Sequence, residues 1–129
     1  MNDFLDHLFM ETGITPEDIG KFKYFTFNVT QEDIDFAIRK NPHHCPIARA
    51  INRTLGLPNG STFVYCGEVF GEITIRLPSV DDPLFFYNSE ESREFATRFD
   101  KQEPVEPARF TITRCRELNK VEYIEPEED

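Results

Sequence analysis

The sequence predicts a single α+β domain in which a mostly antiparallel sheet of about four strands is covered by helices on one face. Three observations support this prediction. The chain has 129 residues, the usual length of one domain. Aromatic residues make up 13% of it, enough large side chains to fill a core. Segments of strand and helix character follow one another in the order β-α-α-β-β-(β)-α-β, with short connections.

The first twenty residues are expected to form a helical extension before the domain. Residues 2–10 carry apolar side chains at helical spacing, and a short capped turn then ends at Gly20. The apolar stripe consists of Phe4, Leu5, Leu8 and Phe9. Such a stripe either packs back on its own domain or is offered to a partner chain, so these four residues are candidate partner-binding residues.

The domain is expected to begin with a strand and a helix. Residues 21–29 are rich in aromatic and β-branched side chains, which predicts the strand. Thr30 then serves as the helix N-cap, and Asp33 completes a capping box. The helix is expected to cover residues 31–40, because the residue before Pro42 avoids the helical conformation. Its inward stripe is Ile34, Ala37 and Ile38.

Turn and cap residues place the remaining elements. A second helix is expected between Pro46, which suits a first helical turn, and Gly56, which ends a helix. Two apolar strands follow in residues 61–77, as a hairpin with irregular or bulged geometry around Gly67 and Gly71. Residues 84–88 are either a further short strand or a buried connection. Ser89 caps a third helix, and the last strand follows two prolines.

The formal net charge of −10 is concentrated at the two ends of the chain. Residues 1–20 hold five acids and no Lys or Arg, and residues 120–129 hold five acids against one lysine. The chain therefore divides into a helical extension (residues 1–20), an α+β domain (residues 21–118) and a solvated acidic tail (residues 119–129). Direct binding of DNA or RNA is not expected, because tracking phosphates requires positive potential along the binding face.

Three cysteines without a C-x-x-C pair signal neither a disulfide framework nor a zinc ribbon. No charged-then-apolar leader opens the sequence, and no apolar run approaches the ~20 residues that span a bilayer. We therefore expect reduced thiols, a cytoplasmic location and no membrane partner. Because there is no P-loop, G-x-G-x-x-G, H-E-x-x-H or EF-hand spacing, no cofactor or metal is expected. The oligomeric state is left open.

The segment NPHHCP, residues 41–46, places two histidines and a cysteine before the second helix. A thiol at a helix N-terminus can ionise more readily, and with His43 or His44 as base Cys45 would be a nucleophile. The alternative is architectural: Cys45 fills the corner between two helices while the histidines lie in an exposed turn. The architectural interpretation is favoured, because adjacency in sequence does not give a base its geometry and no oxyanion-hole motif is present. A metal site that adds Cys66 and Cys115 is disfavoured, because three consecutive side chains rarely converge on one ion.

Arg49 and Arg53 stand one turn apart on the outer face of the second helix. On an acidic molecule such a pair can receive a phosphate or a partner's carboxylate. More commonly it forms a solvated face paired with acids such as Asp33 or Asp35. The candidate ligand-binding or anion-binding residues are therefore His43, His44, Cys45, Arg49 and Arg53.

Three short motifs occur in a fixed order: VTQEDID entering a helix, CPIARAINR at a helix start, and the succession Phe-Asp, Val-Glu-Pro, Phe within EFATRFDKQEPVEPARFTI. In this order they resemble small uncharacterised proteins encoded by bacteriophages and prophages. The resemblance covers about residues 28–113 and implies a phage or prophage origin and a compact α+β fold. It implies no established activity and so no catalytic residues. The N-terminal helix and the two histidines before Cys45 depart from it.

Together these observations favour a non-enzymatic intracellular binding module, a phage accessory protein that engages or inhibits a host protein. Its partner would be a protein of host or phage. A different hypothesis is a small-ligand binder or enzyme that uses Cys45 with His43, His44 and Arg49 at a helix N-terminus, where anions are favoured. A third hypothesis is a structural component of a virion.

Overall fold

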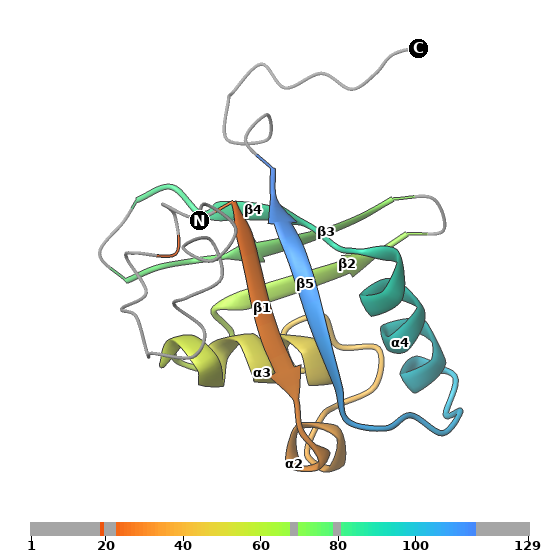
Figure 1. Ribbon diagram of the computed structural model, residues 1–129. Helices are drawn as coiled ribbons and strands as arrows, with labels where there is room; N and C mark the ends of the chain where they lie inside the picture. Colours follow the sequence, from red (N-terminus) through yellow and green to blue (C-terminus); the bar gives the residue numbers. More distant parts are fainter. Residues whose placement is uncertain (1–18, 20–22, 68–69, 79–80, 116–129) are drawn as a thin grey trace.

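The computed structural model describes residue 19 and residues 23–67, 70–78 and 81–115. This part of the chain holds five strands and three helices in the order β-α-α-β-β-β-α-β (Figure 1). The strands are β1 (Tyr24–Val29), β2 (Thr62–Cys66), β3 (Gly71–Ile75), β4 (Leu84–Tyr87) and β5 (Ala108–Arg114). The helices are α2 (Gln31–Asp35), α3 (Pro46–Leu55) and α4 (Glu90–Asp100).

The strands form one antiparallel sheet in the order β1-β5-β4-β3-β2. The strands β2, β3 and β4 follow one another as a meander, and β5 returns after α4 to lie between β4 and β1. The contact between β4 and β5 is short: only Phe86 pairs with Arg114 and Tyr87 with Thr113. Figure 1 shows β1 and β5 running steeply across the direction of β2 and β3. The sheet is therefore strongly twisted, and one face curves around the core.

The core lies between the curved face of the sheet and the helices. Phe25 and Phe27 of β1 lie opposite Ile112 and Phe110 of β5, and all four side chains are buried. The rings of Phe25 and Phe86 lie 6.3 Å apart between centroids, although β5 separates their strands. Helix α3 packs against both edge strands, β1 and β2, and α4 packs against α3 and β2. Both helices thus cover the same face, and alternate residues of the strands face away from them.

The fold class predicted from the sequence is confirmed. Residues 84–88, which the sequence left as a strand or a connection, contain β4, so the sheet has five strands rather than about four. The hairpin within residues 61–77 pairs five consecutive residues without a skipped position, so the paired strands hold no bulge, and residues 68–69 of its turn lie outside the described residues. The extension over residues 1–20, apart from buried Ile19, and the tail over residues 119–129 lie outside the described residues.

The predicted caps act where the sequence placed them. Thr30 Oγ1 accepts a hydrogen bond from the Asp33 backbone N–H at 3.2 Å, and Asp33 Oδ2 accepts one from the Thr30 N–H at 3.0 Å. This reciprocal pair is the predicted capping box. Gly56 ends α3 in the left-handed conformation, with a φ of 67°. Ser89 Oγ accepts from the Ser92 N–H at 3.2 Å at the start of α4.

The helix predicted over residues 31–40 is too long, because α2 ends at Asp35. The inward stripe is wrong at Ile38, whose side chain is 53% exposed. The Ile38 N–H donates to the His44 carbonyl at 2.8 Å. This bond holds residues 38–44 in a non-helical turn, so α2 does not continue. Phe36, the C-cap residue, is left on the surface.

The turns between α2 and α3 lie along the outer edge of β2. The Val64 N–H donates to the Pro42 carbonyl at 3.0 Å. The Lys40 N–H donates to Asp100 Oδ1 of α4 at 2.9 Å. An edge strand with unpaired backbone N–H groups can pair with a strand of another chain. At Val64 the protein's own backbone occupies that position.

Candidate functional site

Cys45 is the N-cap residue of α3. Its backbone is extended (φ −76°, ψ 168°), and its Sγ accepts a hydrogen bond from the Ala48 N–H at 3.4 Å. Pro46 follows at the first helical position, where its missing N–H costs nothing. The Cys45 side chain is 5% exposed. This buried capping position, on the side of α3 that faces β2, supports the architectural interpretation of Cys45.

The environment of Cys45 opposes ionisation of its thiol. Burial raises the pKa of Cys45 to about 12 from the ordinary 9.0, and hydrogen bonds from the backbone of Ala48 and Ile47 offset only part of this rise. Because the thiolate is the nucleophile, a thiol that keeps its proton at neutral pH is a weak one. The helix N-terminus therefore does not activate this cysteine.

The two histidines take different places. His43 is exposed, and its ring meets the ring of Phe63 on β2 edge-on, with centroids 5.1 Å apart. Its backbone N–H donates to Asn41 Oδ1 at 3.0 Å. His44 is half-buried and accepts the Ile38 bond through its carbonyl. The pair therefore shapes the turn, and His43 also lies beside an exposed residue of the sheet.

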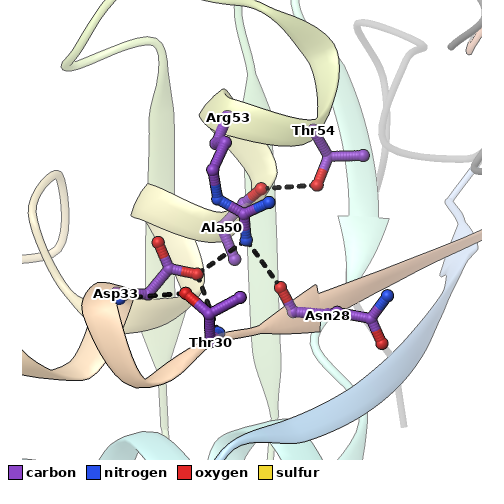
Figure 2. A network of polar contacts seen from close by, with 6 residues as sticks. All are labelled: Asn28, Thr30, Asp33, Ala50, Arg53 and Thr54. Atoms are coloured by element: carbon purple, nitrogen blue, oxygen red, sulfur yellow. Dashed lines mark hydrogen bonds and ion pairs between the residues drawn. The ribbon is translucent and has the colours of Figure 1, made fainter.

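Arg53 is used within the fold. Its Nη2 donates to Asp33 Oδ2 at 2.7 Å and to the Asn28 carbonyl at 2.8 Å, as Figure 2 shows. Asp33 is buried and also belongs to the capping box, so one carboxylate joins α2 to α3. Of the two roles expected for Arg53, binding an anion or pairing with an acid of the chain, the structure thus shows the second, with Asp33 as the acid.

Arg49 lines a cavity of about 160 Å³ beside α2, together with Asn52, Asn59 and the acids Glu32 and Asp33. Its guanidinium carbon lies 5.8 Å from the centroid of the exposed Phe36 ring. The Nε atom of Arg49 is buried and has no hydrogen-bond partner in the part of the chain that the structure describes. A buried donor without a partner is costly, which makes this nitrogen a candidate contact for an anion.

Cys45 lines a second cavity, of about 230 Å³, on the β2 side of α3. Cys66, Lys40 and Asp100 also line it. Both cysteines are free thiols, and burial raises the pKa of Cys66 as well. The five candidate ligand-binding residues therefore do not converge on one site, because Arg49 and Arg53 line the cavity beside α2. Among the described residues, no group of three His, Cys, Asp or Glu side chains is placed to hold a metal ion.

The most distinctive surface feature is aromatic and was missed from the sequence. We call it the aromatic surface: Phe63, Tyr65, Phe70 and Tyr87, each between 37% and 49% exposed. All four belong to β2, to β4 or to the residue before β3, on the face that the helices leave open. Only a weak sign of this surface is present in the sequence. The segment TFVYC of β2 carries apolar side chains on both faces and so resembles a strand that is buried on both sides.

Glu72 of β3 lies at the centre of the aromatic surface. The strand register places it opposite Tyr65 on one side and opposite Tyr87 on the other. Burial raises the pKa of the Glu72 carboxyl. An acidic residue paired on both sides with tyrosines therefore stands on a face that otherwise suits apolar contact.

The predicted partner-binding stripe, Phe4, Leu5, Leu8 and Phe9, lies outside the described residues. Across the parts of the chain that the structure describes, no helix combines the length and the apolar character that crossing a bilayer requires. Comparison with protein-family models, with curated proteins and with solved structures finds no match to this chain.

Proposed function

We propose that this protein is an intracellular, non-enzymatic binding module that engages a protein partner through the aromatic surface. The observation that supports this function best is the gathering of Phe63, Tyr65, Phe70 and Tyr87 on one open face. Large exposed apolar side chains gathered in one place are typical of interaction sites. Tyrosine and phenylalanine are enriched at protein interfaces, where they bury large areas at a small cost in entropy.

The neighbourhood of the aromatic surface favours docking by side chains over strand addition. The turn at Pro42 already accepts the Val64 N–H at the edge of β2. A partner strand cannot pair there unless this bond breaks. The face of β2, β3 and β4 that points away from the helices remains open, with His43 beside Phe63 at its border.

The resemblance to bacteriophage proteins extends the proposal to the nature of the partner. The chain would then be a phage accessory protein in the host cytoplasm, and the partner a host protein that it engages or inhibits. This extension depends on the three sequence motifs alone, whereas the docking surface depends on the exposed side chains.

Capture from a bacterial lysate tests the proposal, with the tagged full chain as bait. We expect the wild type to retain one or more proteins. Tyr65→Asp should reduce the captured amount about tenfold or more, because a buried charge without a partner opposes binding. Phe36→Asp is the matched control, since Phe36 is an exposed aromatic outside the aromatic surface. Equal capture by Tyr65→Asp and wild type, or no protein above background, would contradict the proposal.

A second candidate function is anion binding at Arg49, favoured by its buried Nε without a hydrogen-bond partner among the described residues. The cavity beside it holds about 160 Å³, enough for a phosphate or a carboxylate group. Thermal-shift measurements with inorganic phosphate test it. Stabilisation by phosphate that Arg49→Met removes would support it, and the same response in both proteins would exclude it.

A further inference from the structure

The environment of Glu72 differs from that of an ordinary surface acid. In the antiparallel sheet, Tyr65, Glu72 and Tyr87 form one row across β2, β3 and β4. The Asn88 N–H donates to the Gly71 carbonyl at 3.0 Å, so the next pair, Glu72 and Tyr87, is of the non-hydrogen-bonded type, in which side chains approach most closely. The carboxylate thus has an aromatic neighbour on each side.

A third ring extends the row. Phe70 and Tyr87 meet edge-on, with ring centroids 6.5 Å apart and an interplanar angle of 83°. Both rings are partly exposed, Phe70 at 41% and Tyr87 at 37%. The same sheet already shows what such a ring can hold, because Lys23 Nζ lies 5.3 Å from the centroid of the Tyr24 ring on β1.

The charge of Glu72 is not balanced locally. Its carboxylate forms no ion pair with any Lys or Arg in the described part of the chain, and the only effect on its pKa is the rise caused by burial. A carboxylate that is partly desolvated without a cation is less stable than one in water. A cation arriving from a partner would both neutralise it and contact the aromatic rings.

We propose that the row Tyr65–Glu72–Tyr87 binds a basic side chain, arginine or lysine, of the protein partner. This inference rests on the proposed function and names the chemistry that the aromatic surface recognises. The partner segment is basic at its centre and apolar around it, so that Phe63 and Phe70 meet apolar side chains. The net charge of −10 on the whole chain favours the approach of such a segment.

The test uses the ¹⁵N-labelled full chain and two small probes, N-acetylarginine amide and its neutral isostere N-acetylcitrulline amide. At about 100 mM probe and constant ionic strength, we expect the arginine derivative to shift the amide signals of Tyr65, Phe70, Glu72 and Tyr87 about threefold more than the citrulline derivative. High concentrations are needed because an exposed ion pair and an exposed cation–π contact are each weak.

Two variants separate the carboxylate from the rest of the face. Glu72→Gln should reduce the arginine-induced shifts about threefold and should not lower the melting temperature at neutral pH, since the charge that it removes is desolvated. Glu94→Gln, an exposed acid of α4, should leave the shifts unchanged. Equal shifts from both probes, or shifts that survive Glu72→Gln, would overturn the cation site. Lysate capture that Tyr65→Asp abolishes and Glu72→Gln leaves intact would keep the proposed function and reject this inference.

Discussion

The alkylation of Cys45 decides between a binding module and an enzyme that would use this thiol. Iodoacetamide reacts with the thiolate, so its rate follows the ionised fraction. At pH 8, a thiol with the ordinary pKa of 9.0 is about one-tenth ionised, whereas one with a pKa of about 12 is about one ten-thousandth ionised. Ionisation alone therefore slows Cys45 by about a thousandfold. Its 5% exposure slows it further, because the reagent needs access to the sulfur.

Peptide mapping by mass spectrometry after timed labelling of the native chain measures this rate. Cys66 is the internal comparison, since it is less buried than Cys45 and should be labelled first. Labelling in urea is the second comparison, and there Cys45 should react at the rate of a free cysteine. If native Cys45 reacts at pH 7 as fast as free cysteine or faster, the argument from burial is wrong and the nucleophile hypothesis returns.

The remaining predictions concern stability, each measured by urea unfolding with linear extrapolation. Asp33→Ala should lower the free energy of unfolding by about 2–4 kcal/mol, because it removes the capping box and the acceptor of the Arg53 hydrogen bond. Asp35 is exposed, so Asp35→Ala is the control and should lower this free energy by less than about 0.5 kcal/mol. Gly56→Ala should cost about 1 kcal/mol for purely conformational reasons, since φ is +67° and no atom lies within 4 Å of the added Cβ. The folded pKa of Cys45, about 12, lies above the unfolded 9.0, so its contribution is complete below pH 9 and is lost as the pH rises toward 12. The wild type should therefore lose stability above pH 9 more steeply than Cys45→Ser does, and parallel profiles would contradict a raised thiol pKa.

Much of the fold could be predicted because its signals are local. Thr30 with Asp33, Pro46, Gly56 and Ser89 mark helix ends through hydrogen bonds and backbone angles within a few residues. The aromatic and β-branched content of β1 identifies the strand for the same reason. The histidine turn, with His43 exposed, and the capping Cys45 also follow from neighbours in the sequence.

Contacts between distant residues decided the rest. The end of α2 depends on the bond from Ile38 to His44, and the division of the candidate site depends on how α3 packs, with Cys45 toward β2 and Arg53 toward α2. Neither is encoded by a local propensity.

The aromatic surface shows the difference most clearly. The sequence predicted that β2 is an apolar strand and left β4 as an apolar strand or connection, but both faces of these segments carry large side chains. Only the packing of α3 and α4 on one side decided which of these side chains are buried and which remain exposed around Glu72. The physical reason is that side chains alternate between the two faces of a strand. The sequence of a strand therefore shows which face enters the core only when one face is apolar and the other is polar.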